Sequence, residues 1–292
     1  MNVEFLVHAH VYYAEMWPEL SRSLQVIPAC SRELWVTLPL QQTAIAQRIR
    51  TDFPDARILY IRNVGYDIYP FTEVLRRVEL AHYRFCIKVH TKRNLLTQTH
   101  VGAEDVSGSL WREYLLSFLA PEHFCKCLTA FDRNEKLGMV GHHSLICHEE
   151  PADAVAWQQS LHWLTQCGML SGEIPDNLSF VAGSMFMCRA HLLQPVKTIL
   201  QNREFEVPSH ENPSTLSHCA ERLLGHVVGA AGYSIQDVYT KRKSRLYLAL
   251  RSRCIYGLRR MLRLIYQKKI TRSRHLLIKF CKIPVCHLSL KD

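Results

Sequence analysis

Hydrophobic and polar residues alternate in two patterns through the first 240 residues. Short apolar runs rich in Val, Ile, Leu and Phe predict strands at residues 3–7, 34–38, 57–61, 84–89, 137–141, 180–187 and 233–238. Longer segments with apolar residues at helical spacing predict helices at residues 12–24, 41–53, 71–81, 109–119, 121–133, 152–167, 189–200 and 215–228. Such alternation is typical of an open, mainly parallel sheet covered by helices, so we predict one α/β domain over residues 1–240.

The pattern changes after residue 240. Apolar residues now recur every three or four positions, at Tyr247, Leu250, Cys254, Leu258, Met261 and Ile265. Arginines surround this stripe, so we predict a basic amphipathic helical tail over residues 241–292. The tail lacks a run of 18 uncharged apolar residues, so a membrane-spanning helix is not predicted.

The net positive charge of the chain lies in this tail. Residues 241–292 hold 16 Lys and Arg and one acidic residue, a net charge of +15, whereas residues 1–240 hold 20 basic and 25 acidic residues, a net charge of −5. A basic amphipathic helix favours an anionic membrane surface, because apolar burial and electrostatic attraction add. A helix packed on the first domain is the alternative. Nucleic-acid binding is disfavoured, because no recognition motif accompanies the charge.

Cysteine usage indicates a reducing compartment. The 11 cysteines are scattered and odd in number, and the chain begins directly with a predicted strand instead of a secretory signal. Neither Cys125-Lys-Cys127 nor the histidines show a recognised metal-ligand spacing. We therefore expect a cytoplasmic protein without structural zinc.

Candidate chemistry lies at the ends of two predicted strands. Strand 57–61 ends in a turn that carries Asn63, Gly65 and Asp67, and strand 84–89 runs into His90 and Lys92. Ligands of open α/β sheets bind at the carboxyl ends of strands, so we expect these residues to face one ligand-binding site. The alternatives are an ordinary Asn-x-Gly turn and a solvated basic loop.

Absent motifs narrow the chemistry further. No strand is followed by a GxGxxG or GxxxxGK[ST] signature, and no Asp-x-Asp pair exists in the chain. A histidine and a lysine can neutralise the negative charge of a phosphate-bearing ligand directly. His90 and Lys92 therefore favour a site that works without a metal cofactor, and Mg²⁺ or Mn²⁺ stays an alternative.

Other candidates come from more distant segments. His8 and His10 point to one face of the first strand, and the small pair Gly183-Ser184 interrupts an apolar strand, so both pairs are ligand-binding candidates. Structural histidines and tight strand packing are the alternatives. Glu221 lies opposite the apolar stripe of helix 215–228 and is the candidate general base, with Asp67 as its rival. A surface pair between Glu221 and Arg222 is the alternative.

These motifs resemble the rhamnan synthesis protein F family of bacterial polysaccharide enzymes. The resemblance covers roughly residues 3–240 in the family's order. It rests on His8-Ala-His-Val-Tyr-Tyr13, Asn63-Val-Gly-Tyr-Asp-Ile-Tyr-Pro-Phe71, Lys88-Val-His-Thr-Lys92, Trp111-Arg112, Gly183-Ser-Met-Phe186 and His218-Cys-Ala-Glu-Arg222. One position departs, because Tyr66 stands where the family usually has Arg between the Gly and the Asp.

The resemblance implies a fold similar to the GT-A type and a sugar-nucleotide-dependent glycosyltransferase. The ligand-binding candidates would then bind the nucleotide-sugar donor: His8, His10, Asn63, Gly65, Asp67, His90, Lys92, Gly183 and Ser184. A donor such as dTDP-L-rhamnose and a lipid-linked glycan acceptor are implied, as is an inverting transfer in the making of an O-antigen or rhamnan. The protein would then act on the inner face of the plasma membrane as a peripheral protein. A non-catalytic scaffold that keeps the fold is the main alternative, because Tyr66 replaces the Arg. A nucleic-acid-binding protein using the basic tail is the second.

Overall fold

The computed structural model describes most of the first 240 residues and short pieces beyond them. The described residues are 3–40, 42–93, 99–101, 104–106, 108–148, 155–171, 175, 178–208, 215–240, 266–270, 275–280 and 283–289. The chain divides into two compact units, Met1–Thr240 and Lys241–Asp292. Each unit is described by itself.

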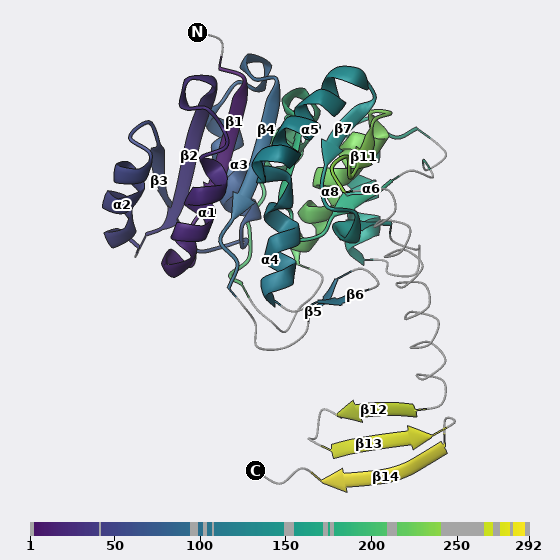
Figure 1. Cartoon of the computed structure of the whole chain (residues 1–292). Helices are drawn as coiled ribbons and strands as arrows, with labels where there is room; N and C mark the ends of the chain where they lie inside the picture. Colours follow the sequence, from purple (N-terminus) through teal and green to yellow (C-terminus); the bar gives the residue numbers. More distant parts are fainter. Residues whose placement is uncertain are drawn as a thin grey trace. The chain divides into compact units, whose positions relative to one another are not determined.

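A seven-stranded sheet forms the centre of the first unit (Figure 1). Its strand order is β11-β7-β10-β4-β1-β2-β3. The strands are β1 (Phe5–His10), β2 (Arg32–Pro39), β3 (Arg57–Ile61), β4 (Phe85–His90), β7 (Leu137–Val140), β10 (Phe186–Arg189) and β11 (Ser234–Gln236). Strand β10 runs antiparallel to both β4 and β7, and the other neighbouring pairs are parallel. The prediction of a mainly parallel α/β sheet is confirmed.

Burial explains the order of the strands. All six residues of β1 and all six of β4 are buried, whereas β3 at the sheet edge is partly exposed. Continuous apolar runs suit strands that are covered on both faces. The two central strands therefore carry their polar residues, among them His8, Lys88 and His90, into the interior or to the strand ends.

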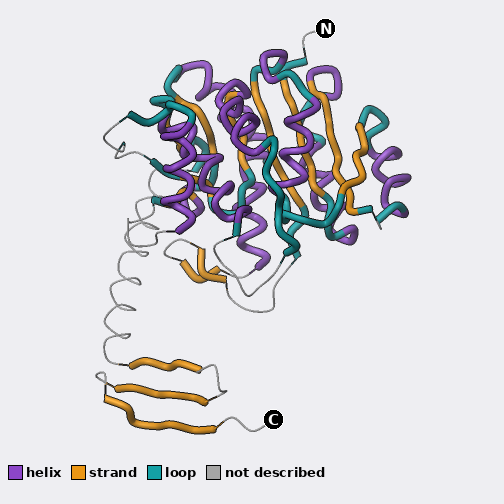
Figure 2. The backbone as a smooth tube through the Cα atoms, turned by 180° about the vertical axis from the view of Figure 1, so that it is seen from behind, coloured by secondary structure: helices purple, strands orange, loops and turns teal. Residues whose placement is uncertain are grey.

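Helices cover both faces of this sheet (Figures 1 and 2). They are α1 (Trp17–Leu24), α2 (Ala44–Asp52), α3 (Ile68–Arg77), α4 (Gly108–Leu116), α5 (Pro121–Arg133), α6 (Val155–Gln166), α7 (Gln194–Leu200) and α8 (Leu216–Ala230). Proline stands in the first helical positions of α1, α5 and α7, where a missing N–H breaks no hydrogen bond. None of the described helices is both long and apolar enough to cross a membrane.

The segment predicted as one strand over residues 180–187 is two strands. Strand β9 (Phe180–Val181) pairs with β8 (Ile146–Cys147), and β10 belongs to the main sheet. Between them the chain turns at Gly183 and Ser184, which both have positive φ, 82° and 50°. A second small pair is formed by β5 (Thr99–Val101) and β6 (Glu104–Val106).

The second unit corrects the prediction of a purely helical tail. Its described residues form an antiparallel sheet of β12 (Tyr266–Ile270), β13 (His275–Phe280) and β14 (Ile283–Ser289). Ile278 pairs with Cys286 in the register of β13 and β14. The stripe predicted from Tyr247 to Ile265 lies outside the described residues.

Candidate active site

The turn after β3 delivers Asp67 to the carboxyl edge of the sheet. Gly65 and Tyr66 both adopt positive φ, 63° and 53°, and the Gly65 N–H donates to the carbonyl of Glu206 at 2.8 Å. A Cβ on Gly65 would lie 2.6 Å from the ring of Phe205, so only glycine fits there. Asp67 then occupies the N-cap position of α3. Asn63 is exposed in the same turn.

Lys88 ties Asp67 to the turn before β10. Its side chain is completely buried, and its Nζ atom donates to the Ser184 carbonyl at 3.0 Å and to Ser184 Oγ at 2.8 Å. Lys88 also forms an ion pair with Asp67, and Ser184 Oγ donates to the same carboxylate oxygen. Three segments that are far apart in sequence thus share one hydrogen-bonded network.

The backbone of Gly183 is held from two sides. His90 Nε2 donates to the Gly183 carbonyl at 2.9 Å and lies 3.8 Å from Asp67 Oδ2. The Gly183 N–H donates to Glu221 Oε1 at 2.7 Å, and Arg222 Nη1 donates to Glu221 Oε2 at 3.2 Å. The predicted site residues Asp67, His90, Gly183, Ser184 and Glu221 therefore come together at one edge of the sheet.

The pKa values of Asp67 and Glu221 are shifted in opposite directions. Burial alone would raise the pKa of Asp67, but charge interaction with His90 and Lys88 and hydrogen bonds from Lys88 and Ser184 hold it well below its usual range. Burial raises the pKa of Glu221, opposed in part by Arg222. Burial lowers the pKa of His90, opposed by Asp67. Glu221 is therefore the carboxylate with the more basic environment at this edge.

The histidines of β1 lie below this network. His8 Nε2 and His10 Nδ1 are 2.9 Å and 3.0 Å from Thr37 Oγ1, and the His8 ring stacks on Phe71. Burial lowers the pKa of His8, and it lowers the pKa of His10 to about 3. His8 has no exposed surface and His10 is 4% exposed, so His8 offers a donor less surface than His10 does.

Lys92 lies on the same edge as Asp67. Its Nζ atom is 4.3 Å from the ring centre of Trp111 on α4, and the Trp111 indole nitrogen is 3.6 Å from the position of a Cβ on Gly183. A small, open hollow begins here, lined by Met16, Glu19, Leu20, His90, Thr91, Lys92, Arg112, Leu116 and Met185. Arg112 forms an ion pair with Glu19 at its rim, at 3.1 Å.

The carboxylates of Asp67, Glu221 and Glu19 are already paired. Asp67 is bound by Lys88, Glu221 by Arg222 and the Gly183 N–H, and Glu19 by Arg112. Mg²⁺ and Mn²⁺ prefer oxygen ligands. At this end of β4 the described residues offer His90 and Lys92 beside paired carboxylates, which is a poor fit to a cation held against a diphosphate.

Two groups of residues escaped the sequence analysis. Lys88 occupies an alternating strand pattern, so only its family motif marked it and no role was predicted. His142, His143 and Asp237 lie close together at the ends of β7 and β11. Consecutive histidines directly after a predicted strand were a possible signal, but their acidic neighbour lies 94 residues away in sequence.

A family model described as rhamnan synthesis protein F matches residues 2–233. The chain belongs to the rhamnan synthesis protein F family. The match includes every segment of the edge network, from β1 through β4 and β10 to α8.

Two curated relatives and one solved structure share low sequence identity with this chain. Two curated proteins of Xanthomonas campestris pv. campestris, from strains B100 and ATCC 33913 and both named uncharacterized protein WxcX, are 28% identical over 240 residues. The alignments cover 78% of this chain but 32% of each relative, so the chain spans about a third of their length. Among solved structures, core-mannan synthase A from Aspergillus fumigatus in a Mn/GDP form matches with a TM-score of 0.37 and 9% identity, over 80% of this chain and 69% of that one.

Proposed function

We propose that this rhamnan synthesis protein F family member is a glycosyltransferase of bacterial surface polysaccharide synthesis, with a GT-A-like fold. The observation that carries the proposal is the convergence of Asp67, His90, Gly183-Ser184 and Glu221 at the carboxyl edge of a mainly parallel sheet. Ligands of open α/β sheets bind at that edge. The family supports a nucleotide-activated sugar as donor, with L-rhamnose as the first sugar to test.

Donor binding is assigned to the basic side of the edge. His90 and Lys92 line the hollow, and His90 and Asp67 hold Gly183 and Ser184 at the same edge. His10, Asn63 and Gly65 are the further donor-binding candidates from the sequence. Developing negative charge on a diphosphate leaving group is stabilised by such cationic and N–H groups held in place beforehand. Because the nearby carboxylates are paired with cations, the donor site acts without Mg²⁺ or Mn²⁺ in this proposal.

Glu221 is the proposed general base. Its pKa is raised by burial, and a base with a pKa closer to neutrality accepts a proton from a hydroxyl more readily. Asp67 is the weaker candidate, because Lys88 and Ser184 bind its carboxylate and its pKa is held low. In an inverting transfer, Glu221 takes the acceptor hydroxyl's proton while the sugar–phosphate bond breaks on the opposite face. Asp67 then serves to fix the Gly183-Ser184 turn.

The acceptor and the place of action are inferred from the second unit. Residues 241–292 carry a net charge of +15, which suits an anionic membrane surface where lipid-linked glycans are assembled. We assign the protein to the inner face of the plasma membrane, as a peripheral protein bound through this unit. Nucleic acid is not a partner in this proposal.

Turnover with a Glu221→Gln variant tests the enzyme assignment. Purified wild-type protein is incubated with nucleotide sugars, and release of the nucleotide is measured. The amide oxygen of Gln accepts the Gly183 N–H but takes no proton, so kcat falls about 10²- to 10⁴-fold while donor binding persists. Glu73→Gln is the matched control, because Glu73 is a buried carboxylate of α3 that pairs with Arg76 and Arg77.

Two results would contradict the enzyme assignment. One is unchanged turnover in Glu221→Gln. The other is a wild-type protein that binds sugar nucleotides and never turns them over, with any acceptor. The second result would favour a scaffold role, for which Tyr66 in place of the family's Arg is the sequence argument.

A further inference from the structure

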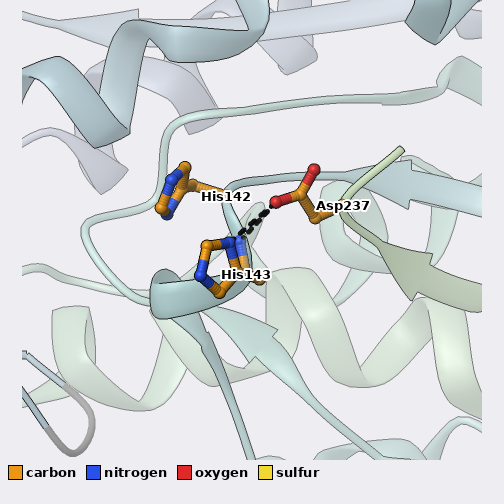
Figure 3. Close-up of side chains that lie close together, drawn as sticks. All are labelled: His142, His143 and Asp237. Carbon is orange, nitrogen blue, oxygen red and sulfur yellow. Dashed lines mark hydrogen bonds and ion pairs between the residues drawn. The ribbon is translucent and has the colours of Figure 1, made fainter. Parts of the chain in front are cut away.

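Two histidines and an aspartate meet at the carboxyl edge, on strands that the donor site does not use. His142 and His143 directly follow β7, and Asp237 directly follows β11. These strands are parallel neighbours, and Val140 pairs with Gln236 at their ends. One ligand atom from each side chain lies within 4.8 Å of the other two, and Figure 3 shows the three side chains together.

Surrounding contacts orient the carboxylate of Asp237. Its Oδ2 atom accepts the His143 N–H at 3.1 Å and lies 2.9 Å from His143 Nδ1. Its Oδ1 atom accepts the N–H groups of Tyr239 at 3.1 Å and Thr240 at 2.9 Å. Asp237 is 4% exposed, so this is a buried carboxylate fixed by four hydrogen bonds. Such outer contacts are what orient carboxylate ligands in metal sites.

The two imidazoles are held as well. His142 is 7% exposed, and its ring stacks flat on Tyr114 of α4 with ring centres 4.0 Å apart. Its Nδ1 atom accepts the Ser144 N–H at 3.2 Å, so the Nδ1 lone pair is shared with this N–H in the structure. Ligation there exchanges a long hydrogen bond for a metal bond. The His143 side chain is 19% exposed, which leaves the group accessible from solvent.

We propose that His142, His143 and Asp237 form a binding site for a divalent transition-metal ion of the zinc type. Imidazole nitrogen together with carboxylate oxygen is a ligand set that such ions prefer. Metal–ligand bonds of about 2.0–2.1 Å place two tetrahedral ligands roughly 3.4 Å apart. His143 Nδ1 and Asp237 Oδ2 are already near that separation, and the ion replaces the proton between them, which goes to solvent.

Three protein ligands leave coordination positions for water or a substrate oxygen. That arrangement is typical of metal sites that take part in binding or chemistry, whereas structural zinc sites have four protein ligands. Helix α4 connects the site with the donor edge, because Tyr114 stacks on His142 and Trp111 lies beside Gly183. The inference goes beyond the proposed transferase activity, and metal binding is measured without turnover.

Cobalt titration of the full-length, EDTA-treated protein tests this site. Co²⁺ in a mixed nitrogen and oxygen site gives visible d–d absorption, and we expect this band to saturate at one ion per chain. Added Zn²⁺ should remove the band by competition. In His143→Gln, the side-chain amide still donates an N–H toward Asp237 but offers no imidazole ligand, so Co²⁺ affinity falls by at least about 10-fold.

Control variants separate the site from the other histidines. His191→Gln changes an exposed histidine of another segment and should leave the Co²⁺ band unchanged. His142→Gln is the second ligand variant, and circular dichroism verifies that each variant is folded. The proposal is overturned if wild type gives no d–d band, or if the band persists unchanged in both folded ligand variants. A band that carries thiolate charge transfer would also overturn it, because the three residues include no cysteine.

Discussion

Lys88 is the residue on which the geometry of the edge depends. A buried lysine is tolerated only when its charge is paired and its N–H groups are satisfied, and Asp67 and Ser184 do both. Its position in β4 is fixed by pairing with His8 on one side and Phe186 on the other. The network therefore links the order of the sheet to the placement of Asp67.

Replacing Lys88 by Met tests this dependence. The methionine removes one partner of a buried ion pair and leaves the Asp67 carboxylate without its cation, so we expect the free energy of unfolding to fall by about 3–5 kcal/mol. Adding Asp67→Asn should recover part of the loss, because the uncompensated charge is then gone. Urea denaturation of wild type, Lys88→Met and the double variant at pH 7.5 measures both effects. A loss below about 1 kcal/mol would show that the pair is unimportant for folding.

Sequence pattern predicted some of these residues and missed others for a physical reason. Asp67 and His90 follow predicted strands, and Glu221 lies on the polar face of a predicted helix. At such positions a polar residue can be recognised as a ligand-binding candidate from the sequence alone. Lys88 shares one face of its strand with Cys86 and His90, and its partners are 21 and 96 positions away. Only the folded structure reveals that the Lys88 side chain is buried.

Helix α8 carries Glu221 and packs closely on β9. A Cβ on Gly225, one turn after Glu221, would overlap the Ser179 carbonyl and the backbone of Phe180. We expect Gly225→Ala to lower the free energy of unfolding by about 1–3 kcal/mol through overpacking, although Ala favours helix. Because the helix must shift, donor binding should weaken too. Gly168→Ala is the control, since that Cβ meets no atom within 4 Å and only its positive φ is strained.

Comparison of Gly225→Ala and Gly168→Ala uses thermal denaturation and donor titration together. If Gly225→Ala folds and binds donor like wild type, then the packing of α8 on Ser179 and Phe180 is not tight enough to exclude a Cβ at position 225. If both variants lose stability equally, backbone conformation and not close packing is responsible.

The contact between α6 and α8 predicts a pH dependence. His226 is fully buried, burial lowers its pKa to about 3, and its Nδ1 atom lies 2.9 Å from Ser160 Oγ. The unfolded chain binds this proton below about pH 6.5, whereas the folded protein does not until about pH 3. Stability is therefore complete above pH 6.5 and falls as the pH is lowered toward 3.

Removing this group should flatten the dependence. In His226→Leu, the slope of the unfolding free energy between pH 6 and 4 decreases by up to about 1.4 kcal/mol per pH unit. Urea denaturation at several pH values measures the slope, and any pH-independent loss of packing appears equally at pH 8. An unchanged slope would show that His226 is protonated in the folded protein.

The bounds of helices and strands were easier to predict from the sequence than the way in which strands pair. Strand β3 and helix α5 begin and end where the pattern predicts, because both are bounded by polar or proline-containing turns. The antiparallel β10 was not predicted. Apolar residues on both sides of Gly183-Ser184 give one continuous run, and only the positive φ of both residues turns the chain back.

At the scale of the whole molecule, charge separates the two units. Deleting residues 241–292 should abolish binding to anionic vesicles, because it removes a net charge of +15 from a body of net charge −5. The 292-residue chain should sediment with vesicles containing anionic lipid, less at high salt, and not with neutral vesicles. Retained binding by the deletion variant would place the membrane contact elsewhere. Preference for RNA over vesicles would favour the nucleic-acid alternative.

The most direct test of the central claim is calorimetric titration of the protein with a panel of nucleotide sugars in EDTA. Wild type is compared with Lys92→Gln, which removes the cation beside His90, and with Lys197→Gln, whose lysine donates to the Val78 carbonyl away from the hollow. We predict that at least one sugar nucleotide binds without divalent metal, about 10-fold or more weaker in Lys92→Gln and unchanged in Lys197→Gln. Failure of every sugar nucleotide to bind, or equal binding in Lys92→Gln and wild type, would contradict the account.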